Sequence, residues 1–332
     1  MSPPDVQQVQ RVVLFSGGIG SWAAAARVAD RERAAGHGTA RLTLLFTDTL
    51  MEDGDLYRFL IEGACQVLGL PRPAGLVDAL AALPEFHVDR EARVAGLAAA
   101  RARAAESVPG LVWLAEGRDP FEVFRAERML GNSRVDPCSK LLKREPTNRW
   151  LTANRDPQRT VVSVGIDWTE VHRYTAIATR RGGQGWTYDA PLCERPYVTK
   201  PDLLRAAREA GLAPPRLYGL GLAHNNCGSF CIKAGQGHYA LVHRVLPDRY
   251  AFYEAQEEGM RTFLGRDVAM LTDRSGDGKK KPLPLRVLRE RLEAPQVPGP
   301  DGAPVQLDLF DVGGCGCFAT PDAPDVPEEA ES

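Results

Sequence analysis

The N-terminal part of the chain alternates short apolar runs with longer helical stretches. The short runs are continuous rather than alternating, as expected of strands covered on both faces. They predict strands at residues 12–15, 41–47, 75–77, 111–114 and 160–166. The stretches between them predict helices at residues 22–28, 53–68, 120–130, 140–152 and 200–210. Because strands that alternate with helices form parallel sheets, we predict an α/β, doubly wound, Rossmann-like fold with sites at the carboxyl ends of its strands.

The pattern changes after residue 237. Two more helices are predicted at residues 249–264 and 285–292, flanking a short strand at 268–271. Four prolines between residues 294 and 306 indicate a linker, and the acidic end of the chain has the composition of a disordered segment. We therefore predict an α/β domain over residues 1–237, a helical C-terminal part over 238–293, and a Pro-rich linker with a flexible tail over 294–332.

Bulk composition adds little to this picture. The 332 residues are 44% hydrophobic and carry a formal net charge of −2, so no global charge attracts nucleic acid. Local basic pairs such as Arg180 and Arg181 are expected to be solvated. No apolar stretch approaches the roughly 20 residues of a membrane span, and the N-terminus lacks a signal-peptide pattern. We expect a cytoplasmic protein with no membrane partner.

A turn rich in glycine and serine links the first predicted strand to the first helix, which is expected to open at Ser21. Glycines allow the backbone to approach a ligand closely, and the N–H groups at a helix start favour an anion. The turn therefore predicts a phosphate-binding loop. Its candidate ligands are Ser16, Gly17, Gly18, Gly20 and Ser21.

This turn lacks the Lys-Ser/Thr ending of a Walker loop and the wider glycine spacing of a dinucleotide fold. It resembles the Ser-Gly-Gly-x-x-Ser signature of the PP-loop family, although Gly20 stands where that family often has aspartate. The resemblance implies an ATP- and Mg²⁺-binding domain of the adenine nucleotide alpha-hydrolase type, which often adenylates a substrate and releases pyrophosphate. Asp48, at the end of the second predicted strand, is a candidate contact to the adenosine or a metal, or a helix cap.

Seven cysteines in a chain of this kind favour metal or thiol chemistry over a disulfide framework. Cys138 stands near a predicted helix start, and Cys227 and Cys231 lie close together in one loop. Three thiolates suit an iron–sulfur cluster. With His224 they would instead make four ligands for Zn²⁺, and a third possibility is that no metal binds.

The segment that follows Cys138 resembles the iron–sulfur members of the adenylyl-sulfate and phosphoadenylyl-sulfate reductase family. There a Cys-Cys pair precedes a basic residue and a proline; here Cys138, Lys143 and Pro146 match, while Ser139 replaces the second cysteine. The resemblance implies a [4Fe-4S] cluster on Cys138 and the two loop cysteines. One iron would then lack a protein thiolate and could hold sulfide or substrate, as in the tRNA-thiolating PP-loop enzymes that this arrangement resembles.

A second segment, residues 165–173, resembles the Gly-x-Arg segment that follows a strand in the same family. Gly165 and Arg173 match, whereas Asp167 stands where an arginine is usual. The resemblance covers roughly residues 10 to 235 by pattern, and it implies that Lys143 and Arg173 offset negative charge on the substrate. The missing arginine shifts the prediction away from sulfate reduction and toward ATP chemistry.

Glycines flank Cys315 and Cys317 near the C-terminus, which suits a mobile thiol relay. Sulfonucleotide reductases similarly carry a nucleophilic cysteine near that end, so both residues are candidate catalytic thiols. The alternatives are an incidental exposed pair or an additional cluster ligand.

Together these features predict an ATP-dependent sulfurtransferase that adenylates its substrate, with nucleic acid thiolation or phosphorothioation as the favoured reaction. A cysteine desulfurase would then be a partner. The first alternative is a sulfonucleotide reductase that releases sulfite and uses thioredoxin. The second is a nucleotide-sensing module that binds ATP without turnover.

Overall fold

A computed structural model describes residues 9–131, 135–273 and 280–294. The predicted tail, with Cys315 and Cys317, lies outside these residues. Five parallel strands form the central sheet: β1 (Gln10–Leu14), β2 (Leu42–Asp48), β3 (Leu111–Ala115), β4 (Thr160–Ser163) and β5 (Thr187–Asp189). Their order is β3-β2-β1-β4-β5, so the direction in which strands are added reverses between β1 and β4. The prediction of a doubly wound parallel sheet is confirmed.

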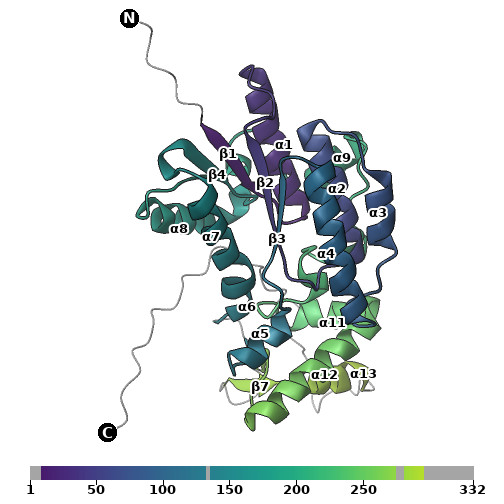
Figure 1. Cartoon of the computed structure of the whole chain (residues 1–332). Helices are drawn as coiled ribbons and strands as arrows, with labels where there is room; N and C mark the ends of the chain where they lie inside the picture. The colour runs from purple at the N-terminus through teal and green to yellow at the C-terminus, as the bar shows by residue number, and fades with distance from the viewer. Residues whose placement is uncertain (1–8, 132–134, 274–279, 295–332) are drawn as a thin grey trace, which may run out of the picture.

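Helices cover both faces of this sheet (Figure 1). One face carries α1 (Ile19–Ala34), α2 (Gly54–Leu68), α4 (Arg90–Ser107) and α9 (Lys200–Glu209), with α3 (Ala74–Ala81) packed on α2 and α4. The other carries α7 (Glu145–Asn154) and α8 (Val171–Gly182). Successive residues of a strand point to opposite faces. Val13 therefore packs in the core beneath α1 and α2, whereas Val12 and Leu14 pack in the core beneath α7 and α8.

A third core lies beyond the carboxyl ends of the strands, where the C-terminal helices gather at the bottom of Figure 1. It joins α5 (Pro120–Ala126), α11 (Gln236–Val245), α12 (Pro247–Leu264) and α13 (Leu285–Glu293) with the antiparallel pair β6 (Leu271–Asp273) and β7 (Lys281–Leu283). Short elements connect these parts: α6 (Pro137–Ser139), the π-helix η1 (Lys140–Arg144), η2 (Pro157–Arg159), η3 (Trp168–Glu170), η4 (Pro191–Cys193), α10 (Arg216–Gly219) and η5 (Cys227–Ser229).

Three local predictions were wrong. Residues 75–77 lie inside helix α3, because a short apolar run cannot by itself separate a strand from a buried helix. Helix α1 begins at Ile19 rather than Ser21, which places two residues of the loop within its first turn. The strand expected at 268–271 begins only at Leu271. Across the ranges described above, no helix combines the length and apolar character needed to cross a membrane.

Candidate functional site

The turn after β1 is braced by its own serines. The Ser21 hydroxyl accepts the N–H of Ser16 at 3.1 Å and donates to the carbonyl of Gly18 at 2.8 Å. The N–H of Ile19, at the start of α1, donates to the Tyr218 hydroxyl at 3.1 Å. Ser21 therefore maintains the shape of the loop, and Tyr218 closes one side of it.

The glycines of the turn serve different purposes. Gly17 has a φ of +75°, and a Cβ there would lie 2.8 Å from the Leu56 side chain, toward the core. A Cβ on Gly18 would instead approach the Tyr218 hydroxyl at 3.3 Å. Gly20 packs against the backbone after β4, because its Cβ would lie 2.9 Å from the Gly165 carbonyl oxygen. That contact leaves no space for the aspartate that the PP-loop pattern often has at this position.

The loop opens onto a pocket at the switch point between β1 and β4, with an empty volume of about 1010 Å³. Crevices at this point of an open parallel sheet are the usual ligand sites. The predicted residues that line it are Ser16, Gly18, Gly20, Ser21, Lys143 and Arg173. Gly17 is not among the residues that line it, and neither is Asp48.

Asp48 has a different environment from the one predicted. Its buried carboxylate accepts hydrogen bonds from the Tyr57 hydroxyl at 2.8 Å, the Leu50 N–H at 2.7 Å and the Trp113 indole at 3.0 Å. Burial raises the pKa of this carboxyl group above its ordinary value, against the lowering effect of these hydrogen bonds. Asp48 thus organises the carboxyl end of β2 beneath the site.

Two asparagines supply buried acceptor atoms to this pocket. Asn225 is only 1% exposed, and its amide nitrogen donates to the Gly17 carbonyl at 3.0 Å. That contact orients its Oδ1, which is buried without a hydrogen-bond partner among the described residues, as is Oδ1 of Asn226. A buried acceptor left unpaired costs about 1–3 kcal/mol. Both atoms are therefore suited to a ligand that brings hydrogen-bond donors or a hydrated cation.

Charged side chains of both signs line the same pocket. Arg173, in the first turn of α8, pairs with Glu170 just before that helix, and Lys200 donates to the Ala223 carbonyl at 2.6 Å. Asp167 also lines it, so the segment after β4 presents carboxylates as well as a guanidinium. Such a mixture suits a phosphate chain that carries Mg²⁺ better than it suits a bare sulfate.

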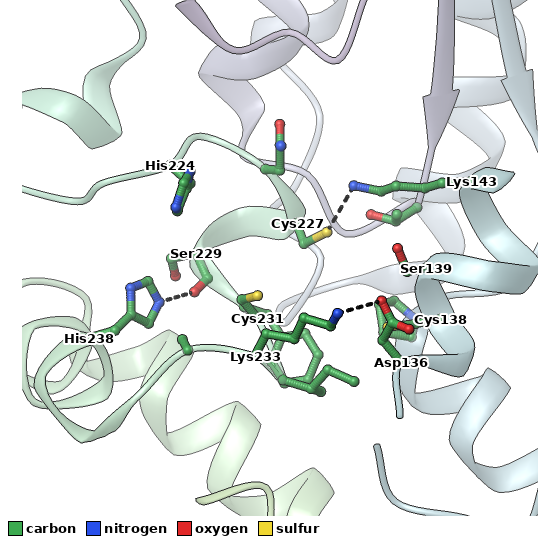
Figure 2. A pocket seen from close by; sticks show the side chains of 16 residues that line it. Asp136, Cys138, Ser139, Lys143, His224, Cys227, Ser229, Cys231, Lys233 and His238 are labelled. Carbon is green, nitrogen blue, oxygen red and sulfur yellow. Dashed lines mark hydrogen bonds and ion pairs between the residues drawn. The ribbon is translucent and has the colours of Figure 1, made fainter. Parts of the chain in front are cut away.

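All three predicted cluster cysteines line a second pocket, with an empty volume of about 680 Å³ (Figure 2). Cys138 belongs to α6, whereas Cys227 and Cys231 come from the loop around η5. None of the five cysteines in the described ranges forms a disulfide. This pocket adjoins the first one, onto which the predicted phosphate loop opens and which is called the phosphate-loop pocket below. The two share Lys143, His224 and Asn226 in their linings.

Lys143 stands between the two pockets. It is 5% exposed, and its ammonium donates to the Cys227 sulfur at 3.4 Å and lies 4.0 Å from the Glu52 carboxylate. Burial raises the pKa of Glu52 to about 7, although the charge of Lys143 opposes the shift. Glu52 also accepts the N–H of Cys227. An ammonium beside a sulfur stabilises the thiolate, the form that binds metals and attacks electrophiles.

The turn that carries Cys227 has an uncommon backbone. The φ values are +52° at Cys227, +60° at Gly228 and +82° at Ser229, a backbone region that residues other than glycine rarely adopt. A Cβ on Gly228 would lie 2.4 Å from the Met51 carbonyl oxygen, so glycine is required there. Strained turns persist only where their surroundings hold them, and they concentrate at functional sites.

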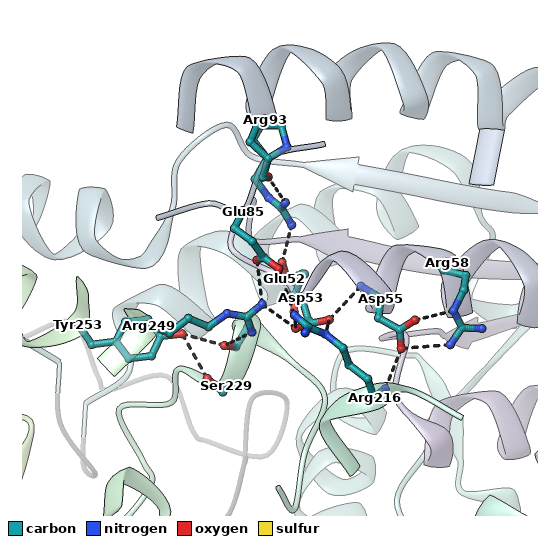
Figure 3. Close-up of polar contacts among 12 residues, drawn as sticks. Glu52, Asp53, Asp55, Arg58, Glu85, Arg93, Arg216, Ser229, Arg249 and Tyr253 are labelled. Atoms are coloured by element: carbon teal, nitrogen blue, oxygen red, sulfur yellow. Dashed lines mark hydrogen bonds and ion pairs between the residues drawn. The ribbon is translucent and has the colours of Figure 1, made fainter. Parts of the chain in front are cut away.

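The C-terminal helices hold this turn in place (Figure 3). The Gly228 carbonyl accepts the Tyr253 hydroxyl at 2.8 Å and the Arg249 guanidinium at 3.0 Å. His238 contacts the Ser229 carbonyl at 2.7 Å. Arg249 also pairs with Asp53, at the start of α2, at 2.7 Å. The helical region predicted over residues 238–293 thus positions the cysteine loop.

His224 differs from the cysteines in its placement. Burial, and then the charges of neighbouring cations, lower its pKa to about 4, so the imidazole is neutral at pH 7. In Figure 2 it lies on the opposite side of the pocket from Cys138. Within the part of the chain that the structure describes, no three Cys, His, Asp or Glu side chains are placed to share a single metal ion.

Sequence reasoning missed several residues of the site. Glu52 and Lys200 lie outside both motifs, and Tyr218 precedes Cys227 by nine residues. The fold brings Lys200 and Tyr218 to the first pocket and Glu52 against Lys143 and the Cys227 N–H. Asn225 and Asn226 did carry a signal, since they separate His224 from Cys227, but amides have no spacing rule that identifies a ligand.

A scan against protein-family models finds no match, and a search of curated proteins finds no significant match. The function therefore has to be argued from the two adjoining pockets.

Proposed function

We propose that this protein is an ATP-dependent sulfurtransferase of the PP-loop, adenine nucleotide alpha-hydrolase type, similar to phosphoadenylyl-sulfate reductases. One observation carries the proposal: a pocket built on a Ser-Gly-Gly loop adjoins a pocket lined by three cysteines, and Lys143 lines both. A nucleotide activated in the first pocket would lie next to sulfur chemistry in the second.

In the first pocket, ATP would place its phosphates against the start of α1. Gly18 and Gly20 line the pocket at that point, and Lys143 and Arg173 supply positive charge. Mg²⁺ is usually held by one or two carboxylates together with phosphate oxygens. Asp167 is the carboxylate we assign to it, because Gly20 leaves the loop without one.

The proposed reaction has two displacements. An oxygen of the acceptor attacks the α-phosphorus of ATP, a new P–O bond forms, and pyrophosphate leaves. A sulfur nucleophile then forms a bond to the activated atom of the acceptor, and AMP leaves with the acceptor oxygen. Lys143 would stabilise the negative charge that develops on the phosphate, and the same ammonium faces the Cys227 sulfur. The sulfur nucleophile would be hydrosulfide, which a thiol releases from the persulfide of a cysteine desulfurase while thiol and desulfurase cysteine join in a disulfide.

The donor set of the second pocket suits a cluster better than a single ion. Thiolates are the ligands that iron–sulfur clusters require, and Cys138, Cys227 and Cys231 line one pocket. Lys143 and Lys233 line it too and would offset the negative charge of thiolates and sulfides. A [4Fe-4S] cluster held by three cysteines would supply an iron able to bind a sulfur ligand. We keep Zn²⁺ as the alternative.

A product assay tests the proposal. The anaerobically purified full chain would be incubated with ATP, Mg²⁺, a sulfide source and an oligonucleotide, and pyrophosphate and AMP would be measured. We expect both products, and sulfur in the oligonucleotide. Sulfite release from adenylyl sulfate without ATP turnover would instead identify a sulfonucleotide reductase. Nucleotide binding with neither product would identify a sensor. Either result contradicts the proposal.

A further inference from the structure

A third pocket, apart from the two described above, lies between α7 and α8 and has an empty volume of about 490 Å³. Three arginines line it, Arg144, Arg180 and Arg181, together with Thr147, Asn148 and Gln184. Of the described residues that line it, none is acidic. Asp136, outside the pocket, offsets part of the charge of Arg144, but the other two guanidinium groups have neutral polar neighbours in the lining. Such a concave site is electrostatically complementary to an anion.

Neutral partners hold the Arg181 side chain in place. Its guanidinium donates to the side-chain oxygens of Asn148 and Gln184, and to the Tyr188 hydroxyl at 3.4 Å. It also lies 5.9 Å from the centre of the Tyr188 ring. These contacts orient the guanidinium without cancelling its charge. An oriented guanidinium fork matches the geometry of phosphate oxygens.

A buried hydroxyl supplies a second observation at this pocket. Thr147 is only 2% exposed, and its Oγ1 has no hydrogen-bond partner among the residues that the structure describes. Buried hydroxyls normally find a partner. A phosphate oxygen in the pocket would provide one, so the hydroxyl and the arginines favour the same ligand.

The third pocket, called the arginine pocket from here on, is connected to the cysteine pocket, which is the second pocket with Cys138, Cys227 and Cys231 in its lining. Arg144 follows Lys143 in η1, and its guanidinium lies 3.5 Å from the Asp136 carboxylate. The same carboxylate pairs with Lys233 of the cysteine pocket at 3.3 Å. Arg144, which lines the arginine pocket, is therefore the sequence neighbour of Lys143, which lines both pockets of the candidate site.

At the other end of α8, two exposed aromatic rings lie near the phosphate-loop pocket. Trp168 and Tyr197 are 41% and 52% exposed, and their ring centres are 5.5 Å apart. Trp168 directly follows Asp167, which lines that pocket. Unpaired bases stack on exposed aromatic side chains, whereas bases within a duplex are already stacked.

We propose that the arginine pocket binds a backbone phosphate of a single-stranded nucleic acid, the acceptor in the proposed reaction. The proposal rests on that function, and it deepens it by naming where the acceptor docks. Helix α8 has 12 residues and is therefore about 18 Å long. A single-stranded nucleic acid that runs along α8 would place a phosphate at Arg180 and Arg181 and a base on Trp168.

Fluorescence anisotropy with a labelled single-stranded oligothymidine tests this docking. Arg181→Gln and Arg180→Gln should each weaken binding by on the order of tenfold at low salt, and each should reduce the slope of log Kd against log salt concentration by about 1. Trp168→Ala should weaken binding on the order of tenfold without changing that slope. Arg205→Gln, which removes an exposed arginine from α9, is the matched control and should change little.

Three outcomes would overturn the inference: no binding of the oligonucleotide, an equal loss with Arg205→Gln, or binding that is insensitive to both pocket arginines. If inorganic phosphate stabilises the protein through Arg181 while the oligonucleotide does not bind, the site takes free phosphate and the nucleic-acid assignment is wrong. Circular dichroism confirms that each variant is folded. ATP binding, measured on the same variants, reports separately on the proposed function and should be unchanged.

Discussion

Replacing Arg249 by methionine should destabilise the protein strongly. Arg249 is 2% exposed, and its guanidinium contacts the Asp53 carboxylate at 2.7 Å and the Glu85 carboxylate at 2.8 Å. Burial alone would raise the pKa of Asp53, yet the hydrogen bond from Arg216 and the charge of Arg249 hold it below its ordinary value. Methionine would leave the Asp53 carboxylate, which is fully buried, with one fewer cation.

The expected loss follows from the partners that remain. Removing one member of a buried ion pair typically costs 3–5 kcal/mol of unfolding free energy. Asp53 keeps Arg216 at 2.8 Å, and the Gly228 carbonyl keeps Tyr253, so we expect the lower end, about 3 kcal/mol. For a protein of this size, that corresponds to a fall in Tm of about 4 °C.

Urea denaturation followed by circular dichroism measures this loss. Arg286→Met is the matched control, because Arg286 makes an exposed pair with Glu290 at 2.7 Å on α13, and solvent-exposed pairs contribute little to stability. A loss below about 1 kcal/mol for Arg249→Met would refute the argument that this buried network joins the helical region to α2.

Two further predictions concern the electrostatics and the cysteine pocket. Burial raises the pKa of Glu257 from 4.5 to about 7, so its contribution to stability is complete below pH 4.5 and is lost as the pH rises through 7. Urea titrations should show that Glu257→Gln removes about 3 kcal/mol of this pH dependence, and identical profiles would contradict the assignment. Cys138→Ser and Cys231→Ser should each lower the iron content of anaerobically purified protein severalfold, whereas Cys193→Ser, a partly buried cysteine outside the pocket, should not. Equal iron in all three variants would exclude the cluster.

The sheet could be predicted because its signals are local. Continuous apolar runs marked β1, β2 and β3, and the glycines after β1 marked the turn that opens onto the first pocket. The three cysteines could be assigned to one pocket only through resemblance to a family, since nothing in their spacing fixes the distance between α6 and the loop around η5.

The remainder depends on tertiary contacts. The sequence does not show that Gly17 faces Leu56 while Gly18 faces the pocket, because both glycines belong to the same motif. It also does not show that Arg249 reaches Asp53, since the two lie on helices from different parts of the chain. Residues 75–77 were assigned to a strand because their run is too short to show a helical period.

Titration calorimetry of ATP against a Gly18 variant tests the central claim most directly. Gly18 has an ordinary backbone conformation, with φ −93° and ψ 161°, so the backbone accepts valine, whose Cβ would press on the Tyr218 hydroxyl at 3.3 Å and whose methyl groups would occupy the pocket. Gly54→Val is the control, because a Cβ at Gly54 meets no atom within 4 Å among the described residues. We predict that ATP binds the wild type and Gly54→Val and that its affinity for folded Gly18→Val falls at least tenfold. Equal affinity in all three proteins would show that the Ser16–Ser21 loop is not the nucleotide site.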